Sequence, residues 1–431
     1  MKKTSKTILF TLLLSLLFSG IAMSETTLEI WHRGDMAYNE AYNQIGKKFT
    51  EENPDIKVNF ILYPKLEDKL ITAGMADTLP DAWILDTVTT GKWVLNEFVS
   101  KVYKKQFSDK ILDVCWETTR GLDGEYYGIP WSVQGMGIYY RQDWLDKLGL
   151  EFPKTWDELV EVTRQFTYGD PDGDGKDNTY GIGLYGASTR GYGYWTLQNF
   201  LWQAGGSIVK SLDNGKFVAN LNNEETIKTL KFLHDLVYKH KVVPPGVSSV
   251  QSTEVYSSFQ NGLVGMVFHG NYKNSTYADS LGRENVGTAI MPAGSEGSFA
   301  LGEGENIYIS RDTKNYKAII KLAKFMTSLE IQKFGMQIKP SNPVRLSVRK
   351  DIDVIEVTED SLNKPFQEAF LNGNIKYPEN VPDYYPIKII AAELMQEVFL
   401  TDKEPEYKKI VAEYNKKVNN EFKRQGILAE D

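Results

Sequence analysis

Hydrophobic and polar residues near the start of the chain follow the pattern of short strands separated by helices. Residues 27–31 alternate as a strand does, and further strands are predicted at 56–61 and 82–85. Between them, apolar residues spaced three and four apart predict helices over 38–49 and 65–73. Strands and helices in alternation, with short links, favour a mainly parallel sheet covered on both faces. The fold class predicted is therefore α/β.

The rest of the chain is predicted to be rich in helices. Thr155 and Glu158 form a capping box that starts a helix running to about Tyr168. Apolar spacing predicts four more helices, at 227–237, 319–326, 387–399 and 407–422. No repeat and no Pro/Gly/Ser-rich tether divides the chain, so we expect its domains to share several connections.

The first 24 residues have the features of a secretory signal peptide. Three lysines within the first six residues precede an apolar stretch at 8–22, and the small residues Ala22 and Ser24 precede a cut before Glu25. The alternative is an uncleaved membrane anchor, but the apolar stretch is shorter than the roughly 20 residues that span a bilayer. No cysteine lies near the cut, so we expect no lipid anchor and a soluble, exported protein.

Composition narrows the classes of function. A chain of 431 residues suggests two or three domains, and 42% apolar with 25% charged residues is typical of globular proteins. Loss of residues 1–24 takes the net charge from −8 to −11, which argues against a nucleic-acid partner. The single cysteine, Cys115, excludes an intramolecular disulfide and a cysteine-rich metal cluster.

Motifs for catalysis are absent from the sequence. The four histidines do not form H-E-x-x-H, and there is neither a G-x-S-x-G elbow nor a Walker loop. Residues 181–186 match G-x-G-x-x-G, but the glycines after them argue against the helix that dinucleotide binding needs. No carboxylate pair stands out as a glycoside-hydrolase acid and base.

One acidic loop resembles a calcium site. Asp170, Asp172, Asp174 and Asn178 carry carboxylates and an amide at alternate positions, with glycine where a calcium loop turns. Gly181 stands where such loops have a bidentate glutamate. The alternative is a surface turn whose side chains bond their own backbone. A structural calcium ion is therefore a candidate, and no cofactor is required.

A series of motifs then carries a resemblance over essentially the whole chain after residue 24. The motifs are Trp31-His-Arg-Gly-Asp35, Tyr38-Asn39, Gly46-Lys-Lys-Phe49, Lys65-Leu-Glu-Asp-Lys69, Leu79-Pro-Asp81, Tyr127-Gly-Ile-Pro130, Tyr139-Tyr140-Arg141, Thr155-Trp156-Asp-Glu158, Ala204-Gly-Gly206, Gly265-Met266, His269-Gly270-Asn-Tyr272 and Pro343-Val-Arg345. In this order and spacing they resemble the family 1 extracellular solute-binding proteins of ABC sugar importers, to which maltose-binding protein belongs.

The resemblance implies the two-lobe periplasmic binding protein fold of type II, with crossover strands as a hinge. Crossovers are then expected near 133–137, 302–305 and 340–345. The implied division is a signal peptide at 1–24, an N-terminal lobe of 25–133 with 305–342, and a C-terminal lobe of 137–301 with 346–431.

Ligand positions follow from the resemblance one at a time. Asp35 matches a sugar-binding carboxylate, whereas Met36 replaces a lysine. Asp86 and Thr87 follow the third strand, where open α/β sheets bind ligands. The remaining implied positions are Gln134, Tyr192, Tyr194, Tyr272, Tyr384 and Tyr385.

Residue type adds further candidates. Aromatic rings pack the apolar face of a pyranose, while carboxylates and amides pair its hydroxyls. Trp31 ends a strand, Trp131 borders a crossover and Trp195 lies in the second-lobe loop, so each is a candidate platform. The polar candidates are His269, Glu305 and Arg345, of which His269 also fits a structural role.

The resemblance implies a periplasmic protein that captures a sugar or oligosaccharide and delivers it to the permease subunits of an ABC transporter. It implies no enzymatic activity, and we expect a monomer. One alternative is a secreted glycoside hydrolase or lyase. Another is a binder of a different solute such as a sugar phosphate, for which Arg33 and Arg345 are the candidate cations. The sequence does not specify the sugar, its affinity or the permease.

Overall fold

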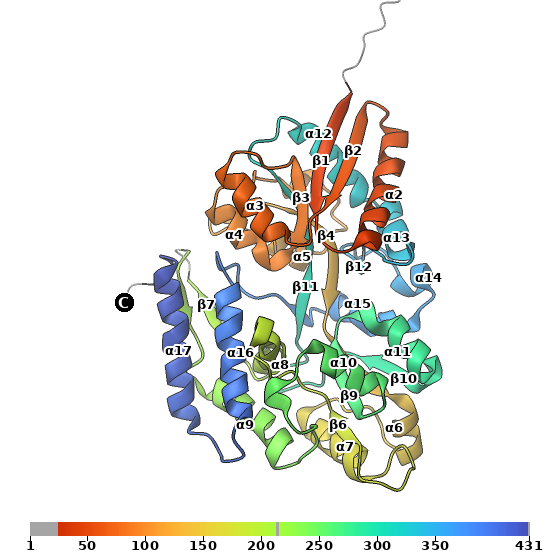
Figure 1. The fold of residues 1–431 in the computed structure, drawn as a ribbon, viewed down its shortest axis with the longest axis vertical. Coiled ribbons are helices and arrows are strands. Elements are labelled where there is room, and N and C mark those ends of the chain that lie inside the picture. Colours follow the sequence, from red (N-terminus) through yellow and green to blue (C-terminus); the bar gives the residue numbers. More distant parts are fainter. Residues whose placement is uncertain (1–24, 213–214, 430–431) are drawn as a thin grey trace, which may run out of the picture.

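The computed structural model describes residues 25–212 and 215–429 and consists of two lobes stacked along the long axis (Figure 1). Each lobe has its own sheet flanked by helices, which confirms the predicted two-lobe α/β fold. The predicted signal peptide, residues 1–24, lies outside the described residues.

The upper sheet has seven strands in the order β12-β4-β11-β3-β1-β2, with β13 paired to β11. Their bounds are β1 (Thr26–His32), β2 (Ile56–Leu62), β3 (Ala82–Asp86), β4 (Ile129–Gly135), β11 (Ala300–Ile309), β12 (Leu346–Ser347) and β13 (Ile375–Lys376). β1 pairs in parallel with β2 and β3. β11 runs antiparallel to β3 and β4, so the chain returns through the middle of the sheet.

The lower sheet has the order β10-β5-β9-β6, and β7 and β8 form a separate ribbon. The bounds are β5 (Gly137–Arg141), β6 (Tyr180–Ile182), β7 (Val209–Ser211), β8 (Phe217–Ala219), β9 (Val264–His269) and β10 (Val286–Ala289). β5 is antiparallel to both β9 and β10, and only β6 and β9 pair in parallel. The prediction of mainly parallel sheets is therefore wrong: both sheets are mixed, because strands that cross between the lobes run against their neighbours.

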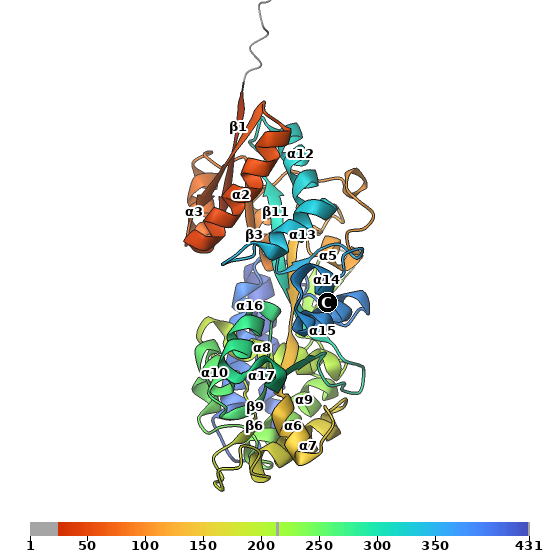
Figure 2. The same cartoon turned by 90° about the vertical axis from the view of Figure 1, so that its right-hand side faces the viewer.

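Helices cover both sheets, and every helix predicted from apolar spacing is confirmed. Those of the upper lobe are α2 (Met36–Glu52), α3 (Leu66–Met75), α4 (Thr90–Leu95), α5 (Asp113–Glu117), α12 (Tyr316–Met326) and α13 (Leu329–Gln337). Those of the lower lobe are α6 (Gln142–Leu148), α7 (Trp156–Tyr168), α8 (Tyr192–Gln203), α9 (Glu224–Tyr238), α10 (Ser252–Gln260), α11 (Asn274–Leu281), α16 (Tyr385–Phe399) and α17 (Tyr407–Arg424). α14 (Val354–Thr358) and α15 (Lys364–Leu371) lie between the lobes (Figure 2). Within the described residues, no helix combines the length and apolar character needed to cross a membrane.

The lobes are connected by strands. β4 ends at Gly135 in the upper sheet, and β5 begins in the lower sheet after the single residue Met136. β11 extends from its pairing with β13 at Ala300 to its pairing with β3 at Glu305 and beyond. β12 pairs with β4, and β13 pairs with β11, within the upper sheet. The prediction that residues from 346 onward belong to the lower lobe is therefore wrong at these two strands. The other lobe boundaries stay a prediction.

Two clusters of buried side chains cover opposite faces of the upper sheet. Ile30 belongs to the cluster that contains Tyr42 and Phe49 of α2, whereas Trp31 belongs to the one that contains Leu66 of α3. Successive residues of a strand point to opposite faces, so neighbours on β1 join different clusters. Burial of each large apolar side chain contributes about 1.5–3 kcal/mol to the free energy of unfolding. Packing on both faces therefore holds β1 and β3 in place, with their carboxyl ends at the edge that faces the lower lobe.

Candidate ligand-binding site

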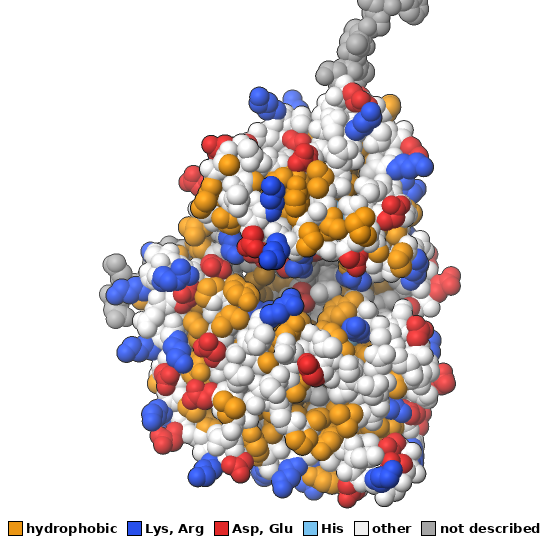
Figure 3. All heavy atoms as spheres, in the orientation of Figure 1, with side chains coloured by type: hydrophobic (Ala, Val, Ile, Leu, Met, Phe, Trp, Pro, Cys, Tyr) orange, Lys and Arg blue, Asp and Glu red, His pale blue; other side chains and the backbone are white. Residues whose placement is uncertain are grey.

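A cleft of about 570 Å³ lies between the two lobes. Figure 3 shows the hollow between the upper and lower halves of the molecule. It is lined by residues at the ends of β1 and β3, by the hinge strands β4 and β11, and by α8 and α16 of the lower lobe. Its size is that of a small-molecule site, and its place beyond the carboxyl ends of parallel strands is where open α/β sheets bind ligands.

An arginine lies between two carboxylates on the upper side of the cleft. Arg33 follows β1, and Asp86 ends β3 directly opposite Glu305 of β11. The Arg33 guanidinium forms an ion pair with Asp86, and its Nε lies 3.8 Å from Oε1 of Glu305. Burial raises the pKa of both carboxyl groups, and Arg33 acts against that rise. The cluster therefore offers carboxylate acceptors whose charged form is favoured by the cation beside them.

Glu305 is supported from the core. Its Oε2 accepts a hydrogen bond from the hydroxyl of Tyr42 at 3.3 Å, and that hydroxyl accepts one from Nε1 of Trp131 at 3.0 Å. Trp131 is fully buried, so this chain of bonds fixes the carboxylate from behind without exposing the indole.

A second carboxylate on the hinge strand faces the cleft. Glu303 lies two residues before Glu305, on the same side of β11. Its Oε2 accepts a hydrogen bond of 3.0 Å from the side-chain amide of Gln134 on β4. Burial raises the pKa of the Glu303 carboxyl. The strands β4 and β11 thus present one amide and two acids to the cleft.

Replacement of Glu303 by glutamine is expected to stabilise the unliganded protein while weakening ligand binding about tenfold, the cost of one charged contact of about 1.4 kcal/mol. Because the folded-state pKa of Glu303 is raised, the folded chain holds this proton more tightly than the unfolded chain. Its carboxylate therefore costs stability that increases as pH rises through the folded pKa and disappears below the unfolded value of about 4.3. Melting curves from pH 4 to 8 check this.

The exposed Glu161 of α7 provides the matched control, because glutamine there removes the same charge outside the cleft. We expect Glu161→Gln to show no pH-dependent increase in melting temperature. An equal increase in Glu303→Gln and Glu161→Gln would mean that the change in net charge, and not the buried position of Glu303, causes the increase.

Aromatic rings line the lower side of the cleft. Tyr194 and Trp195 are on the first turn of α8, and Tyr384 and Tyr385 are at the start of α16. Tyr272 follows β9, and its hydroxyl shares a 2.7 Å hydrogen bond with that of Tyr256. These rings give flat apolar surface with polar edges, which suits a ligand that has both kinds of face.

The structure brings most of the sequence-predicted ligand residues together. Ten of them line the cleft: Asp86, Thr87, Gln134, Tyr194, Trp195, Tyr272, Glu305, Arg345, Tyr384 and Tyr385. Five do not, and they are Trp31, Asp35, Trp131, Tyr192 and His269. Contact of the ten with a ligand stays a prediction.

Trp31 is a correction in the upper lobe, whereas Asp35 lies outside the cleft lining and its contact with a ligand stays a prediction. Trp31 is 5% exposed and packs beside Tyr63 and under α3, where its Nε1 donates a 2.6 Å hydrogen bond to Glu29. Strand alternation turns its ring to the α3 face, away from the cleft. Asp35 is exposed and caps α2, where its carboxylate accepts a 3.0 Å bond from the backbone N–H of Tyr38.

Trp131 and His269 are corrections in the core. Trp131 supports Glu305 through Tyr42, as described, but does not reach the cleft. His269 is fully buried, and burial lowers its pKa to about 3, so the ring is neutral. Since a carbonyl only accepts, Nδ1 donates to Gly270 O at 3.0 Å, and Nε2 accepts from the Tyr277 hydroxyl at 2.7 Å.

Tyr192 also lies outside the cleft lining, although it contacts a residue that lines it. It begins α8 and packs edge-on against Trp195, with ring centroids 5.4 Å apart. It therefore supports a residue that lines the cleft without lining the cleft itself.

Several charged residues of the cleft were not predicted. Glu303 had a sequence signal, because it lies two positions before Glu305 on a strand and so shares its face. The other charged residues come from separate segments, and nothing in the sequence marked them as ligand residues, although Glu67 lies in one of the quoted motifs. They are Glu67, Lys92, Arg190, Asp383 and Lys388, with Arg33 considered only for a phosphate ligand. The uncharged Tyr38, also in a quoted motif, lines the cleft as well.

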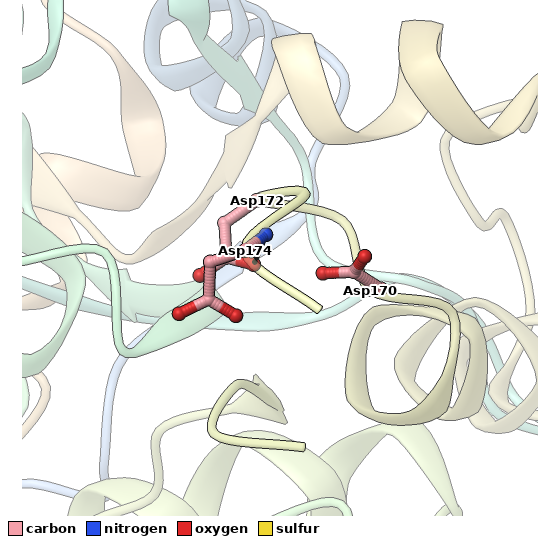
Figure 4. A group of neighbouring side chains, drawn as sticks. All are labelled: Asp170, Asp172 and Asp174. Carbon is pink, nitrogen blue, oxygen red and sulfur yellow. Dashed lines mark hydrogen bonds between the residues drawn. The ribbon is translucent and has the colours of Figure 1, made fainter. Parts of the chain in front are cut away.

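The acidic loop does not line the cleft and forms a compact turn. Carboxylate oxygens of Asp170, Asp172 and Asp174 lie within 4.8 Å of one another. Figure 4 shows Asp172 and Asp174 side by side and Asp170 across the turn. Asp170 also accepts bonds from the backbone N–H groups of Gly173 and Gly175, the geometry of an Asx-type turn. The loop geometry fits both a calcium site and a surface turn that bonds its own backbone, so calcium binding stays a prediction.

A calcium ion at this loop would raise the melting temperature in millimolar calcium chloride relative to a chelator, because binding to the folded state alone stabilises it. Asp172→Asn is expected to remove that increase. A midpoint that is the same in calcium and in chelator would remove the calcium prediction.

Comparison with known proteins decides the family. The family of bacterial extracellular solute-binding proteins matches residues 34–333. The chain belongs to this family.

Individual members agree with the assignment. The polygalacturonan/rhamnogalacturonan-binding protein YtcQ of Bacillus subtilis is 30% identical over 278 residues, which cover 59% of this chain and 53% of YtcQ. The sugar-binding protein MalE of Xanthomonas citri has the same fold, with a TM-score of 0.78 at 22% identity over 93% of this chain and 98% of that one. The maltose-bound MalE3 of T. maritima superposes with a TM-score of 0.72 at 24% identity, over 92% of this chain and 99% of MalE3.

Proposed function

We propose that this solute-binding protein captures a carbohydrate in the cleft between its lobes and passes it, unchanged, to the permease of an ABC transporter. The observation that carries the proposal is the chemistry of the cleft walls. Rings from α8 and α16 face carboxylates and an amide from β3, β4 and β11 across one space.

This pairing of walls matches the surface of a sugar. A pyranose has apolar C–H faces, which pack on aromatic rings, and a rim of hydroxyls, which donate to carboxylates. A buried hydroxyl left without a partner costs about 1–3 kcal/mol, so the acids on β3 and β11 would determine which sugar fits. Relatives named for sugar, maltose and polygalacturonan binding support carbohydrate as the ligand class.

The proposal includes where and with what the protein acts. A signal sequence at residues 1–24 would export it to the periplasm, where it would work as a monomer. Closure of the lobes about β4 and β11 would present the loaded form to the permease, as hinge closure does in periplasmic binding proteins.

Thermal melting with a panel of neutral and acidic mono- and oligosaccharides tests the proposal. A bound sugar should stabilise the folded state by about 2.7 kcal/mol at a hundredfold excess over Kd, and the midpoint should rise accordingly. The same mixtures, incubated and then separated, should contain no shortened products. No shift with any sugar, or cleavage of one, would contradict it.

A further inference from the structure

Charge is unevenly distributed between the two sides of the cleft. On the upper side, Arg33 is paired with Asp86 and Glu305, as described above. Lys92 is also paired there, with its Nζ 2.8 Å from Glu67 and 3.9 Å from Asp383. Arg345 forms no ion pair within the described residues, but its guanidinium donates to the side-chain oxygen of Asn342 at 3.0 Å and lies over the ring of Tyr38.

The lower side has two cations without such partners. Arg190 and Lys388 both line the cleft, and neither forms an ion pair with any carboxylate in residues 25–212 and 215–429. The rings around them offer no negative charge. The lower wall is therefore aromatic and positively charged.

Backbone geometry positions both cations. Gly191 caps α8 with a φ of 74°, and a Cβ there would lie 2.6 Å from Cγ of Lys388, so the lysine stem lies directly against the glycine. The Lys388 ammonium is held 5.4 Å from the centroid of the Trp195 ring. Arg190 has a φ of 53°, a left-handed conformation that costs a non-glycine residue energy and that recurs at ligand sites.

The Lys388 ammonium is held in a buried position at the cleft, with carboxylates and like charges both nearby. Burial lowers the pKa of Lys388, and the nearby Arg190 lowers it further, while Glu303 and Asp86 act in the opposite direction. Two like charges beside an aromatic wall would be stabilised by an anion that enters the cleft.

We propose that the ligand is an acidic sugar, a uronate, whose carboxylate binds between Lys388 and Arg190 while its ring packs on Trp195. This rests on the proposed function and adds the substrate class. A single negative charge fits better than a phosphate dianion, because Asp86, Glu303 and Glu305 face the same cleft and repel excess negative charge. The neutral hydroxyls of the same sugar would meet those acids.

Calorimetric titration of the full exported chain tests this with matched pairs of probes. The acids are galacturonate, glucuronate and digalacturonate, and each is compared with its methyl ester, which keeps the ring and removes the charge. Galactose 6-phosphate tests the phosphate alternative. We expect at least one acid to bind tenfold or more tightly than its ester, and the phosphate to bind more weakly than that acid.

Substitutions assign the preference to the two cations. Lys388→Gln should weaken binding of the acid about tenfold and leave binding of the ester within twofold. Lys409→Gln, which removes an exposed lysine of α17 in the same lobe, should change neither. Arg190→Gly should raise the melting temperature, because glycine tolerates this φ, and should also weaken binding of the acid.

Each contrary outcome has a distinct meaning. If Lys388→Gln weakens acid and ester equally, Lys388 serves closure against Asp86 or Glu303 and the acidic-sugar proposal is wrong. It is also wrong if neutral sugars or galactose 6-phosphate bind as tightly as every acid, although the protein then still binds solutes. If no sugar of either kind binds, the proposed function fails as well.

Discussion

Replacement of Arg33 by methionine is expected to weaken ligand binding about a hundredfold, or about 2.7 kcal/mol. Asp86 and Glu305 are direct neighbours on antiparallel strands, and Arg33 lies beside both and favours their charged forms. Without it, the two carboxylates repel each other, and one takes up a proton or turns away. The ligand then loses acceptors that were held in fixed positions. Calorimetry with the best-binding sugar of the panel measures the loss.

The same variant should lose stability in a pH-dependent way. Without Arg33, the folded pKa values of Asp86 and Glu305 rise further above their unfolded values near 4, so stability is lost as pH rises through the folded pKa values and regained below pH 4. Since Arg33 is 43% exposed, solvent screening limits the loss at pH 7 to about 1–2 kcal/mol.

A triple variant separates the two effects. Arg33→Met combined with Asp86→Asn and Glu305→Gln should recover stability at pH 7 but not binding, because the repulsion is gone while the charged acceptors are missing. Normal affinity in Arg33→Met alone would show that the cluster does not contact the ligand.

Replacement of Trp195 by alanine is expected to weaken binding about thirtyfold, or about 2 kcal/mol, through loss of a large apolar contact surface. The Trp195 ring is held by Tyr185 and Tyr192, whose ring centroids lie 5.2 and 5.4 Å away, and it lines the cleft. Trp195→Phe should retain most of the affinity, since a flat ring remains. Titration calorimetry measures the affinity of each variant, and melting curves measure its stability.

Trp31 provides the contrasting control. It packs under α3 outside the cleft, so Trp31→Phe should lower the melting temperature and leave affinity within twofold of the parent. A large loss of affinity in Trp31→Phe, with none in Trp195→Ala, would show that Trp31 contacts the ligand and Trp195 does not.

The contrast between these tryptophans shows what the sequence can predict. The hydrophobic pattern located β1 and β3, and residues at strand ends such as Asp86 and Thr87 line the cleft. Which face a side chain occupies is harder to predict, because a shift of one residue along β1 moves it from the cleft edge to the α3 cluster. Trp31 and Trp131 therefore had the right chemistry for a sugar platform but occupy the core.

The charged part of the site was the least predictable. Arg190 and Lys388 are nearly two hundred positions apart, and only the packing of α16 against α8 brings them together. No local pattern marks such a pair, since a lone lysine on a helix is ordinarily a solvated surface residue. Glu303 could have been predicted from strand alternation, because it lies two residues before the predicted Glu305 and so shares its face.

Glu303 and Glu305 stand on the strand that passes from one lobe to the other, with Gly302 and Gly304 beside them. A Cβ on Gly304 would lie 2.4 Å from the backbone oxygen of Ser132, so β4 and β11 are in direct contact at this point. If the lobes close about this contact, as proposed, rotation of one lobe would change the positions of the two carboxylates relative to the opposite wall. A sugar that touches both acids would then respond to the interlobe angle, so that recognition and closure would be coupled mechanically.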